Sequence, residues 1–377
     1  MPTIEISSEF DCQFPATVRF PVGGGSGNFT LVEQGGSRKI AVQRDEDHAI
    51  AVISGLQANR KVRFKLEAAG GAAGGVELKD TGPTSVLIQL PEGPFTTYNF
   101  DPSTARPHFY PVLGPGGKAM TRDYPIKDVA EEKAAKDQDH PHHRSFWTAF
   151  DEVNGVNNWA EEKGKHGWTR HKAFTARESG PVFGGFTATA TWLSVDQSTS
   201  ILDEWRRIRV YNAGAEIRLL DYEVRLTAGH GDVSIGDTKE GGILAWRVFH
   251  TMKEKEGGRM ENSNGGVGEA MCWGKKAAWL DYVGPVAGEL LGVAMMDHPG
   301  NPNHPCRWHT RSYGLVGSNP FSTKAFEPTA AETLGHIKAG ETMRFRYRVL
   351  LHRGDARQAM VDDHYHSWVQ APKAVTV

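Results

Sequence analysis

The chain has 377 residues, a formal net charge of −2 and an isoelectric point of about 6.8. This balance contains no basic excess and no long block of one charge, which argues against a nucleic-acid partner. No apolar run approaches the ~20 residues that a membrane-spanning helix requires, and no signal peptide is visible. We therefore expect a cytoplasmic protein without a membrane partner, whose oligomeric state the sequence does not indicate.

The first ninety residues consist of short strand-like segments between glycine-rich turns. These segments alternate apolar and polar side chains or are rich in β-branched residues, and they cover residues 16–22, 49–53, 61–66 and 85–90. We predict an N-terminal β-rich region of sandwich type over residues 1–92, followed by a larger domain over residues 93–377.

Longer strand-like segments follow in the second half of the chain. They alternate over residues 185–193, 202–211, 215–226 and 342–352. Short turns between neighbouring segments favour antiparallel pairing. Helix signals are confined to residues near 126–136 and 356–369. Long antiparallel strands in this number predict an all-β fold, a large antiparallel two-sheet sandwich.

The segment Asp139–Trp147 combines three histidines, an arginine, a carboxylate and an indole within nine residues. Imidazole is the side chain best suited to proton transfer near neutral pH, and it is also the commonest metal ligand. Pro141 disfavours the helical region for the residue before it, so an extended or turn geometry is expected. The segment predicts a site for a small polar ligand; the alternative is a histidine-rich surface turn.

Four separate stretches together resemble one known family. They are residues 106–115, 139–147, 237–242 and 297–321. From about residue 90 to residue 370 the chain resembles the PmoA-like family, whose members are commonly labelled methane oxygenase. Because the methane monooxygenase subunit is a membrane protein, the composition of this chain argues against that label. The β-rich pattern also resembles galactose-mutarotase-like supersandwich proteins, which bind carbohydrates across one sheet.

These resemblances imply a small-molecule carbohydrate as the partner, including oxidised (3-keto) glycosides, and acid–base chemistry of lyase, hydrolase or isomerase type. A base, an acid and cations that stabilise an oxyanion are then required. The predicted catalytic residues are His143, His309, Glu240, Arg144 and Arg311. The predicted substrate-binding residues are His108, Tyr110, Trp147, Asp237, Lys239, Tyr313 and Asn319.

A divalent metal is the main alternative role for the histidines, and no cofactor is certain from the sequence. Its ligands would be His140, His142 and His298, although no recognised ligand spacing supports them. Two other functions stay open, namely a carbohydrate-binding protein without turnover and a metal-dependent redox enzyme. The sequence names neither the sugar nor the bond that changes.

Overall fold

The computed structural model describes residues 2–23, 27–69 and 74–377. Within these ranges β-strands are the main regular structure, and the α-helices are short: α1 (Ala130–Ala134), α2 (Glu269–Cys272) and α3 (Val361–Val369). The predicted all-β fold class is therefore confirmed. No helix in the described ranges combines the length and the apolar character needed to cross a membrane.

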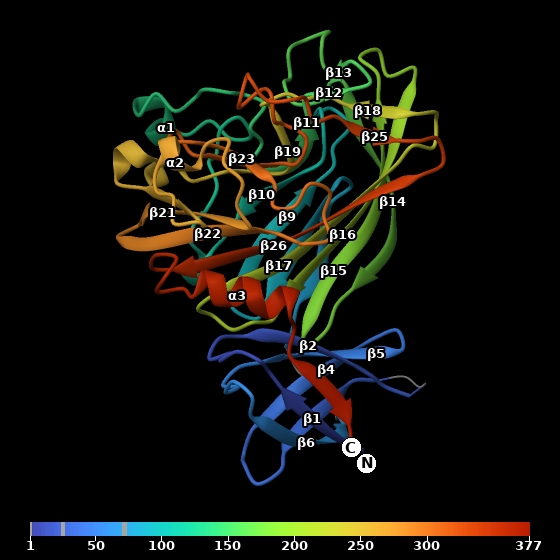
Figure 1. Cartoon of the computed structure of the whole chain (residues 1–377), viewed down its shortest axis with the longest axis vertical. Coiled ribbons are helices and arrows are strands. Elements are labelled where there is room, and N and C mark those ends of the chain that lie inside the picture. Colours follow the sequence, from blue (N-terminus) through green and yellow to red (C-terminus); the bar gives the residue numbers. More distant parts are fainter. Residues whose placement is uncertain (1, 24–26, 70–73) are drawn as a thin grey trace.

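A small antiparallel sheet lies at the bottom of Figure 1 and contains both ends of the chain. Alternate side chains of its strands, among them Ile6, Val18 and Phe64, are fully buried in a core of their own. In sheet order the strands are β2 (Ala16–Pro21), β5 (His48–Ile53), β4 (Lys39–Asp45), β3 (Phe29–Glu33), β6 (Lys61–Ala68), β1 (Thr3–Ser7) and β27 (Lys373–Thr376).

Two large antiparallel sheets form the upper part of the molecule (Figure 1). The first we call the front sheet, a name that does not refer to its place in the view of Figure 1. It runs in the order β23 (Arg307–Arg311), β24 (Leu315–Asn319), β19 (Gly241–Arg247), β11 (Phe146–Phe150), β10 (His108–Val112), β9 (Gly93–Asn99), β8 (Ser85–Leu90) and β7 (Glu77–Gly82). The second, which we call the back sheet, runs in the order β14 (Trp168–Glu178), β15 (Phe183–Leu193), β16 (Ser200–Tyr211), β17 (Arg218–Thr227), β26 (Thr342–Arg353), β22 (Glu289–Asp297), β21 (Trp279–Val286) and β20 (Arg259–Asn262).

The inner faces of the front and back sheets pack against each other and form the main core. The Phe146 ring of the front sheet lies 5.4 Å from the Tyr222 ring of the back sheet, and Phe109 lies 6.3 Å from Phe186. Such interdigitated aromatic side chains supply much of the buried apolar area of a sandwich. The architecture is therefore the large two-sheet sandwich that the long alternating segments predicted.

A minor sheet covers one end of the sandwich, at the top of Figure 1. It runs in the order β13 (Val156–Asn157), β12 (Glu152–Val153), β18 (Val233–Ile235) and β25 (Gly335–Ile337). Short 3₁₀ turns occupy Pro115–Gly117, His250–Met252 and Glu254–Glu256. The segment that follows β18 leads directly to Glu240, so the minor sheet sets the position of that carboxylate.

The strand pairing groups the chain differently from the predicted division at residue 92. β8 pairs with β9 across a two-residue turn, so β7 and β8 belong to the front sheet. At the other end of the chain, β27 pairs with β1 in the small sheet. Alternation along a strand indicates that one face of the strand is buried, but it does not indicate which sheet the strand joins. The sequence therefore did not show that β7 and β8 belong to the front sheet or that β27 belongs to the small sheet.

We expect the small sheet to depend on its own core. Ile6→Ala removes a fully buried side chain and should lower the free energy of unfolding by about 2–5 kcal/mol. Val375→Ala, on the partner strand but 51% exposed, should change it by less than about 0.5 kcal/mol. Denaturant titration of both variants measures the difference. Equal effects would contradict a separate core at this sheet.

Candidate functional site

The outer face of the front sheet carries a layer of aromatic side chains. Successive residues of a strand point to opposite faces, so Trp147 points outward while its neighbour Phe146 enters the main core. Trp147 and Trp159 are fully buried in a small outer cluster with Leu315, and Tyr313 packs against it. This layer forms the floor on which the polar groups of the site lie.

The histidine-rich turn before β11 stacks its rings on this floor. His140 lies 4.7 Å from the His143 ring and 4.7 Å from the Tyr313 ring, nearly parallel to both. His140 has φ of 47° and Ser145 has φ of 61°, a left-handed conformation that such residues rarely adopt. Strain of this kind persists only where the surroundings enforce it, and it is concentrated at functional sites.

Asp139 is the anion that organises this turn. Its carboxylate contacts Arg122, lies 2.7 Å from Arg247 Nη2 and lies 3.0 Å from His140 Nδ1. Burial alone would raise the pKa of Asp139. The hydrogen bond from His140 and the charges of Arg247 and Arg122 outweigh burial and hold that pKa well below its usual range. Asp139 is therefore ionised at neutral pH.

The protonation of His143 is determined by Arg247. Arg247 Nη1 lies 3.0 Å from His143 Nδ1, and a guanidinium has donors only, so Nδ1 accepts. The proton of the neutral ring then resides on Nε2. Burial and the charge of Arg247 lower the pKa of His143 well below 6.5. His143 is thus arranged as a hydrogen-bond donor through Nε2, and not as the base suggested by the sequence.

His309 and Glu240, far apart in the chain, meet at one edge of this turn, as predicted. His309 Nδ1 on β23 lies 3.9 Å from Glu240 Oε2. Burial, followed by the charges of Arg311 and Lys239, lowers the pKa of His309 to about 3. Burial also raises the pKa of Glu240, against the opposing charges of Lys239, His140 and Arg311. A neutral imidazole therefore faces a carboxylate that accepts protons more readily than usual.

The main chain around Glu240 is held by two neighbours. Asn319 donates to the carbonyl oxygens of Thr238 and Lys239 at 2.9 and 3.2 Å, and the Asp151 amide donates to the Glu240 carbonyl at 2.9 Å. Asn319 is thus a positioning residue rather than a surface contact for substrate. Burial and the charge of Glu240 raise the pKa of Asp151 to about 6, which gives the site a second carboxyl group able to exchange protons near neutrality.

Buried polar atoms without partners gather at the floor of the site. Among the described residues, His143 Nε2, His309 Nδ1, Trp147 Nε1 and Trp159 Nε1 make no hydrogen bond. Such atoms are rare in folded proteins because each one costs desolvation energy. The rim above them is accessible, since the side chains of His140 and Glu240 are 37% and 36% exposed. We call His140, His143, Trp159, Glu240 and His309 the histidine site.

Four further residues predicted to take part in catalysis or substrate binding lie at different distances from the histidine site. Tyr313 packs under His140, and Lys239 lies at the rim, 3.8 Å from Glu240. Arg311 lies beside Tyr313, with its guanidinium 5.4 Å from the ring centre. His108 pairs with Trp147 across the strands and is buried, and burial lowers its pKa to about 4.

Arg144 has a different environment from the predicted one. Its guanidinium donates two hydrogen bonds to the Glu161 carboxylate, with Nε 2.8 Å from Oε1 and Nη2 2.6 Å from Oε2. Arg106 binds the same carboxylate at 2.9 Å. Arg144, predicted as a cation that stabilises an oxyanion, therefore links the histidine turn to the loop that carries Trp159, whereas Arg247 is the guanidinium beside His143.

Two other predicted substrate contacts are engaged within the fold. The Tyr110 hydroxyl donates to the Asp123 carboxylate, away from the histidine site. The Asp237 carboxylate accepts from backbone amides of the segment 323–333 and fixes that loop. The sequence showed the right residue types at these positions but not the partners that satisfy them.

The predicted metal ligands are not brought together. His140 and His142 lie in the histidine turn, whereas the His298 ring lies 5.0 Å from Trp368, beside α3. Within residues 2–23, 27–69 and 74–377, no group of three or more His, Cys, Asp or Glu side chains has the arrangement of a metal site. The structure therefore does not assemble the set of His140, His142 and His298.

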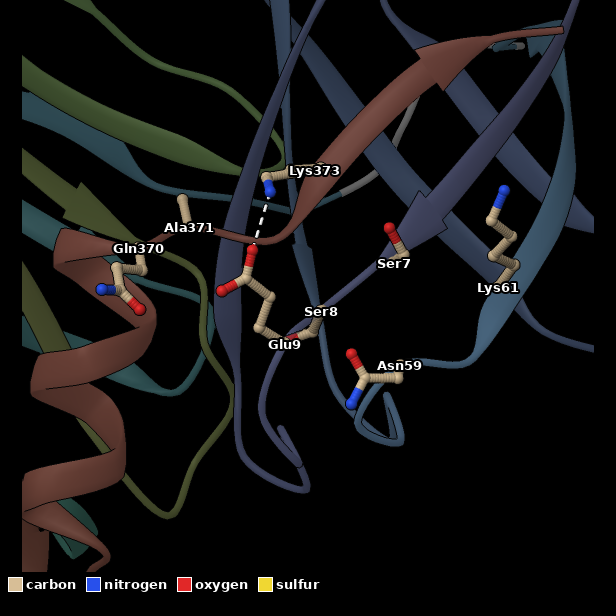
Figure 2. A pocket seen from close by; sticks show the side chains of 8 residues that line it. All are labelled: Ser7, Ser8, Glu9, Asn59, Lys61, Gln370, Ala371 and Lys373. Atoms are coloured by element: carbon tan, nitrogen blue, oxygen red, sulfur yellow. Dashed lines mark hydrogen bonds and ion pairs between the residues drawn. The ribbon is translucent and has the colours of Figure 1, made fainter.

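A polar groove of about 540 Å³ lies far from these histidines, between the end of β1, the start of β6 and the segment after α3 (Figure 2). Its lysines are already paired, because Lys373 lies 2.7 Å from Glu9 and Lys61 lies 2.7 Å from Glu5. The groove is roomy but offers no unsatisfied charge. Size alone is thus a poor guide here, and the chemistry favours the histidine site.

Sequence reasoning missed Arg247, Trp159 and Asp151. Arg247 ends a strand that is otherwise apolar, and a charged residue at the end of a buried strand was a usable signal. Trp159 lies in a polar loop, where a single indole carries little information. Asp151 directly follows β11, and only the fold reveals that Glu240 is its neighbour.

We expect His143 to remain a neutral Nε2–H tautomer from pH 5 to 8, because Arg247 donates to Nδ1 and burial opposes protonation. Long-range ¹H–¹⁵N correlation spectra of the histidine rings distinguish the two tautomers. The Arg247→Met variant removes the donor and should release Nδ1, so that the ring titrates or changes tautomer. An Nδ1–H signal in the unmodified protein would refute this assignment.

His309 should also leave a signature in the stability of the protein. Its pKa is about 3 when folded and near 6.5 when unfolded, so the unfolded state binds more protons below pH 6.5. Its contribution therefore makes stability fall as the pH is lowered from 6.5, by up to about 1.4 kcal/mol per pH unit. Denaturant titrations of the unmodified protein and His309→Gln between pH 7.5 and 5 measure the difference. Parallel pH profiles would contradict a depressed pKa.

Several solved structures of longer proteins resemble the chain weakly. A protein in the Glycosyl Hydrolase Family 38 from Enterococcus faecalis has a TM-score of 0.46 at 10% identity and covers 100% of this chain and 47% of its own. An alpha-mannosidase from Enterococcus faecalis has 0.46 at 8% identity, covering 100% and 46%. A Glycoside Hydrolase Family 97 enzyme in complex with panose from Pseudoalteromonas sp. has 0.28 at 11% identity, covering 74% and 34%.

The chain spans less than half the length of these proteins. A search of curated proteins finds no match. A family described as "Family of unknown function (DUF6807)" matches residues 85–366, which include both large sheets except β7 and every residue of the histidine site. The chain therefore belongs to this family of unknown function.

Proposed function

We propose that the protein is an enzyme that acts on a sugar or a 3-keto glycoside by acid–base chemistry at the histidine site. One observation supports this more than any other, namely the group of unpartnered buried polar atoms, of which His309 Nδ1 lies 3.9 Å from Glu240, a carboxylate with a raised pKa. Unsatisfied buried groups next to a titrating residue are typical of sites that complete their hydrogen bonds with a ligand.

In this proposal Glu240 is the base. It removes the proton from a carbon next to the sugar carbonyl, and the electron pair of that C–H bond moves into the carbonyl group. The developing enolate oxygen accepts a hydrogen bond from His143 Nε2, whose ring is backed by Arg247. A neutral imidazole held in one tautomer suits this role, because its Nε2–H group can donate a hydrogen bond without prior protonation of the ring.

Collapse of the enolate can then follow two routes. Loss of a leaving group from the next carbon gives elimination, whereas return of a proton to the other face gives epimerisation. Asp151, with a pKa of about 6, is the proposed acid for either route. His309 lies beside Glu240 and stays neutral, so it does not compete with the carboxylate for the proton.

Access to His143 requires movement of a ring above it. His143 is 1% exposed and lies under His140, which is 37% exposed and stacks on Tyr313. A sugar ring of similar thickness could take the place of the His140 ring and stack on Tyr313, since the C–H faces of sugars pack well on aromatic rings. The strained φ of His140 is consistent with a residue that changes position on binding.

The identity of the substrate rests on the resemblance to PmoA-like and galactose-mutarotase-like proteins. That resemblance remains a proposal, because the family to which the chain belongs has no known function. A carbohydrate-binding protein without turnover is the alternative. It would need the aromatic floor but would gain nothing from a carboxylate whose pKa is raised beside a neutral imidazole.

We expect Glu240→Gln to lower turnover by about 10²–10⁴, the range of acid–base catalysts, while sugar affinity changes little. Steady-state kinetics and solvent deuterium exchange next to the carbonyl, with native and 3-keto glycosides, measure the effect. Glu162→Gln is the matched control, since Glu162 is exposed and pairs with the exposed Lys165.

Full turnover by Glu240→Gln would show that Glu240 is not the base. Binding of the sugars by the unmodified protein, with neither turnover nor deuterium exchange for any glycoside, would instead favour the binding protein.

A further inference from the structure

The outer face of the back sheet carries a row of arginines that the proposed reaction does not use. Arg207 and Arg209 alternate along β16, and Arg344, Arg346 and Arg348 alternate along β26. Residues two apart on a strand share a face, so these guanidiniums gather on the side of the back sheet that points away from the front sheet.

These arginines line two adjoining cavities of about 170 and 230 Å³. The cavities share Arg207, Arg209 and Asp221 on the sheet and Trp368 in α3. Arg19 of the small sheet lines the second cavity. Figure 1 shows α3 in front of β17 and β26, with the small sheet below. We call the two cavities together the arginine groove.

Positive charge is in surplus along the arginine groove. Glu223 alone faces Arg207 at 3.0 Å, Arg225 at 2.8 Å and Arg344 at 2.7 Å. One carboxylate neutralises only one of these cations. Since the whole chain has a net charge of −2, this surplus is local and not a consequence of composition.

The Arg346 side chain makes no ion pair with any of the residues that the structure describes. Its Nε is buried and makes no hydrogen bond among the described residues. Burial lowers the pKa of Arg346, the charge of Arg344 lowers it further, and the charge of Glu223 raises it. A half-buried guanidinium without a paired carboxylate is partly desolvated, and a bound anion would offset that cost.

His298 lies beside the arginine groove, in contact with Trp368, and its tautomer is fixed. The amide of Gly300 donates to His298 Nδ1 at 2.9 Å, so the proton of the neutral ring lies on Nε2. Burial and the charge of Arg346 lower the pKa of His298 to about 4. Trp368 lies edge-on to His298 at 5.0 Å and offers an indole that lines the groove.

We propose that the arginine groove is a second ligand site, which binds a small polar molecule through a carboxylate or phosphate group held by Arg346 and Arg207. Guanidinium groups bind both oxyanions in a forked geometry, and the indole of Trp368 packs against the remainder of the ligand. The two cavity volumes admit a molecule of monosaccharide size rather than a polymer threaded through the fold. The site lies on the opposite sheet from the histidine site.

Calorimetric titration of the full chain with glucuronate, inorganic phosphate and glucose tests the site. We expect glucuronate or phosphate to bind at the arginine groove and glucose, which has no anionic group, not to bind there. Arg346→Gln should weaken binding about tenfold or more, since a hydrogen bond to a charged group contributes about 1.5–3 kcal/mol. Arg259→Gln, which removes an exposed charge that pairs with Glu261 on the same sheet outside both cavities, should change affinity less than about threefold.

The outcomes separate the two ligand sources. Stronger binding of glucuronate points to a sugar acid, and phosphate binding of equal strength points to a phosphorylated ligand. Arg344→Gln, 46% exposed in the unmodified protein, replaces Arg346→Gln if that variant does not fold. Absence of anion binding at millimolar concentration, equal losses in Arg346→Gln and Arg259→Gln, or loss of binding in His309→Gln would overturn the proposal.

Discussion

The contact of one guanidinium with two neighbours determines the chemistry of the histidine site. Arg247 binds Asp139 at 2.7 Å and His143 Nδ1 at 3.0 Å, and it lies 4.6 Å from the centre of the Tyr313 ring. Because this group only donates, it keeps Asp139 ionised and fixes the tautomer of His143 in the same geometry. A lysine would keep the charge but could not span both acceptors in one plane.

The front sheet can hold this site because neighbouring residues of β11 and β19 point to opposite faces, one into the main core and the other into the outer aromatic layer. Phe146 and Trp246 enter the main core, while Trp147 and Ala245 form the outer floor. Gly242 has a packing role in this arrangement. A Cβ at this position would lie 2.9 Å from that of Ala245 and 3.1 Å from the Trp159 ring. The glycine pair after Glu240 therefore allows Trp159 to close over the strand, a reason that turn propensity alone does not supply.

The strands were predictable from sequence because alternation is a local property, and the histidine turn was predictable because its composition is local. The pairing of His309 with Glu240 was predicted only through the resemblance and the expectation of one sheet. Arg247 and Trp159 reach the site through strand register and loop packing, which no local pattern encodes. Arg144 and Asp237 had suitable chemistry, but their side chains are occupied by Glu161 and by backbone amides.

Burial of imidazole beside guanidinium changes the assignment of acid and base in this protein. Low polarity and neighbouring positive charge both oppose protonation, so His143 and His309 stay neutral at the pH where free histidine titrates. The same burial raises the pKa of Glu240 and that of Asp151. The carboxyl group of Asp151, with a pKa of about 6, is therefore better suited to proton exchange near neutral pH than the imidazoles of His143 and His309, and His143 becomes a fixed donor. A cluster rich in histidine thus implies a site, but only its neighbours decide which group carries the proton.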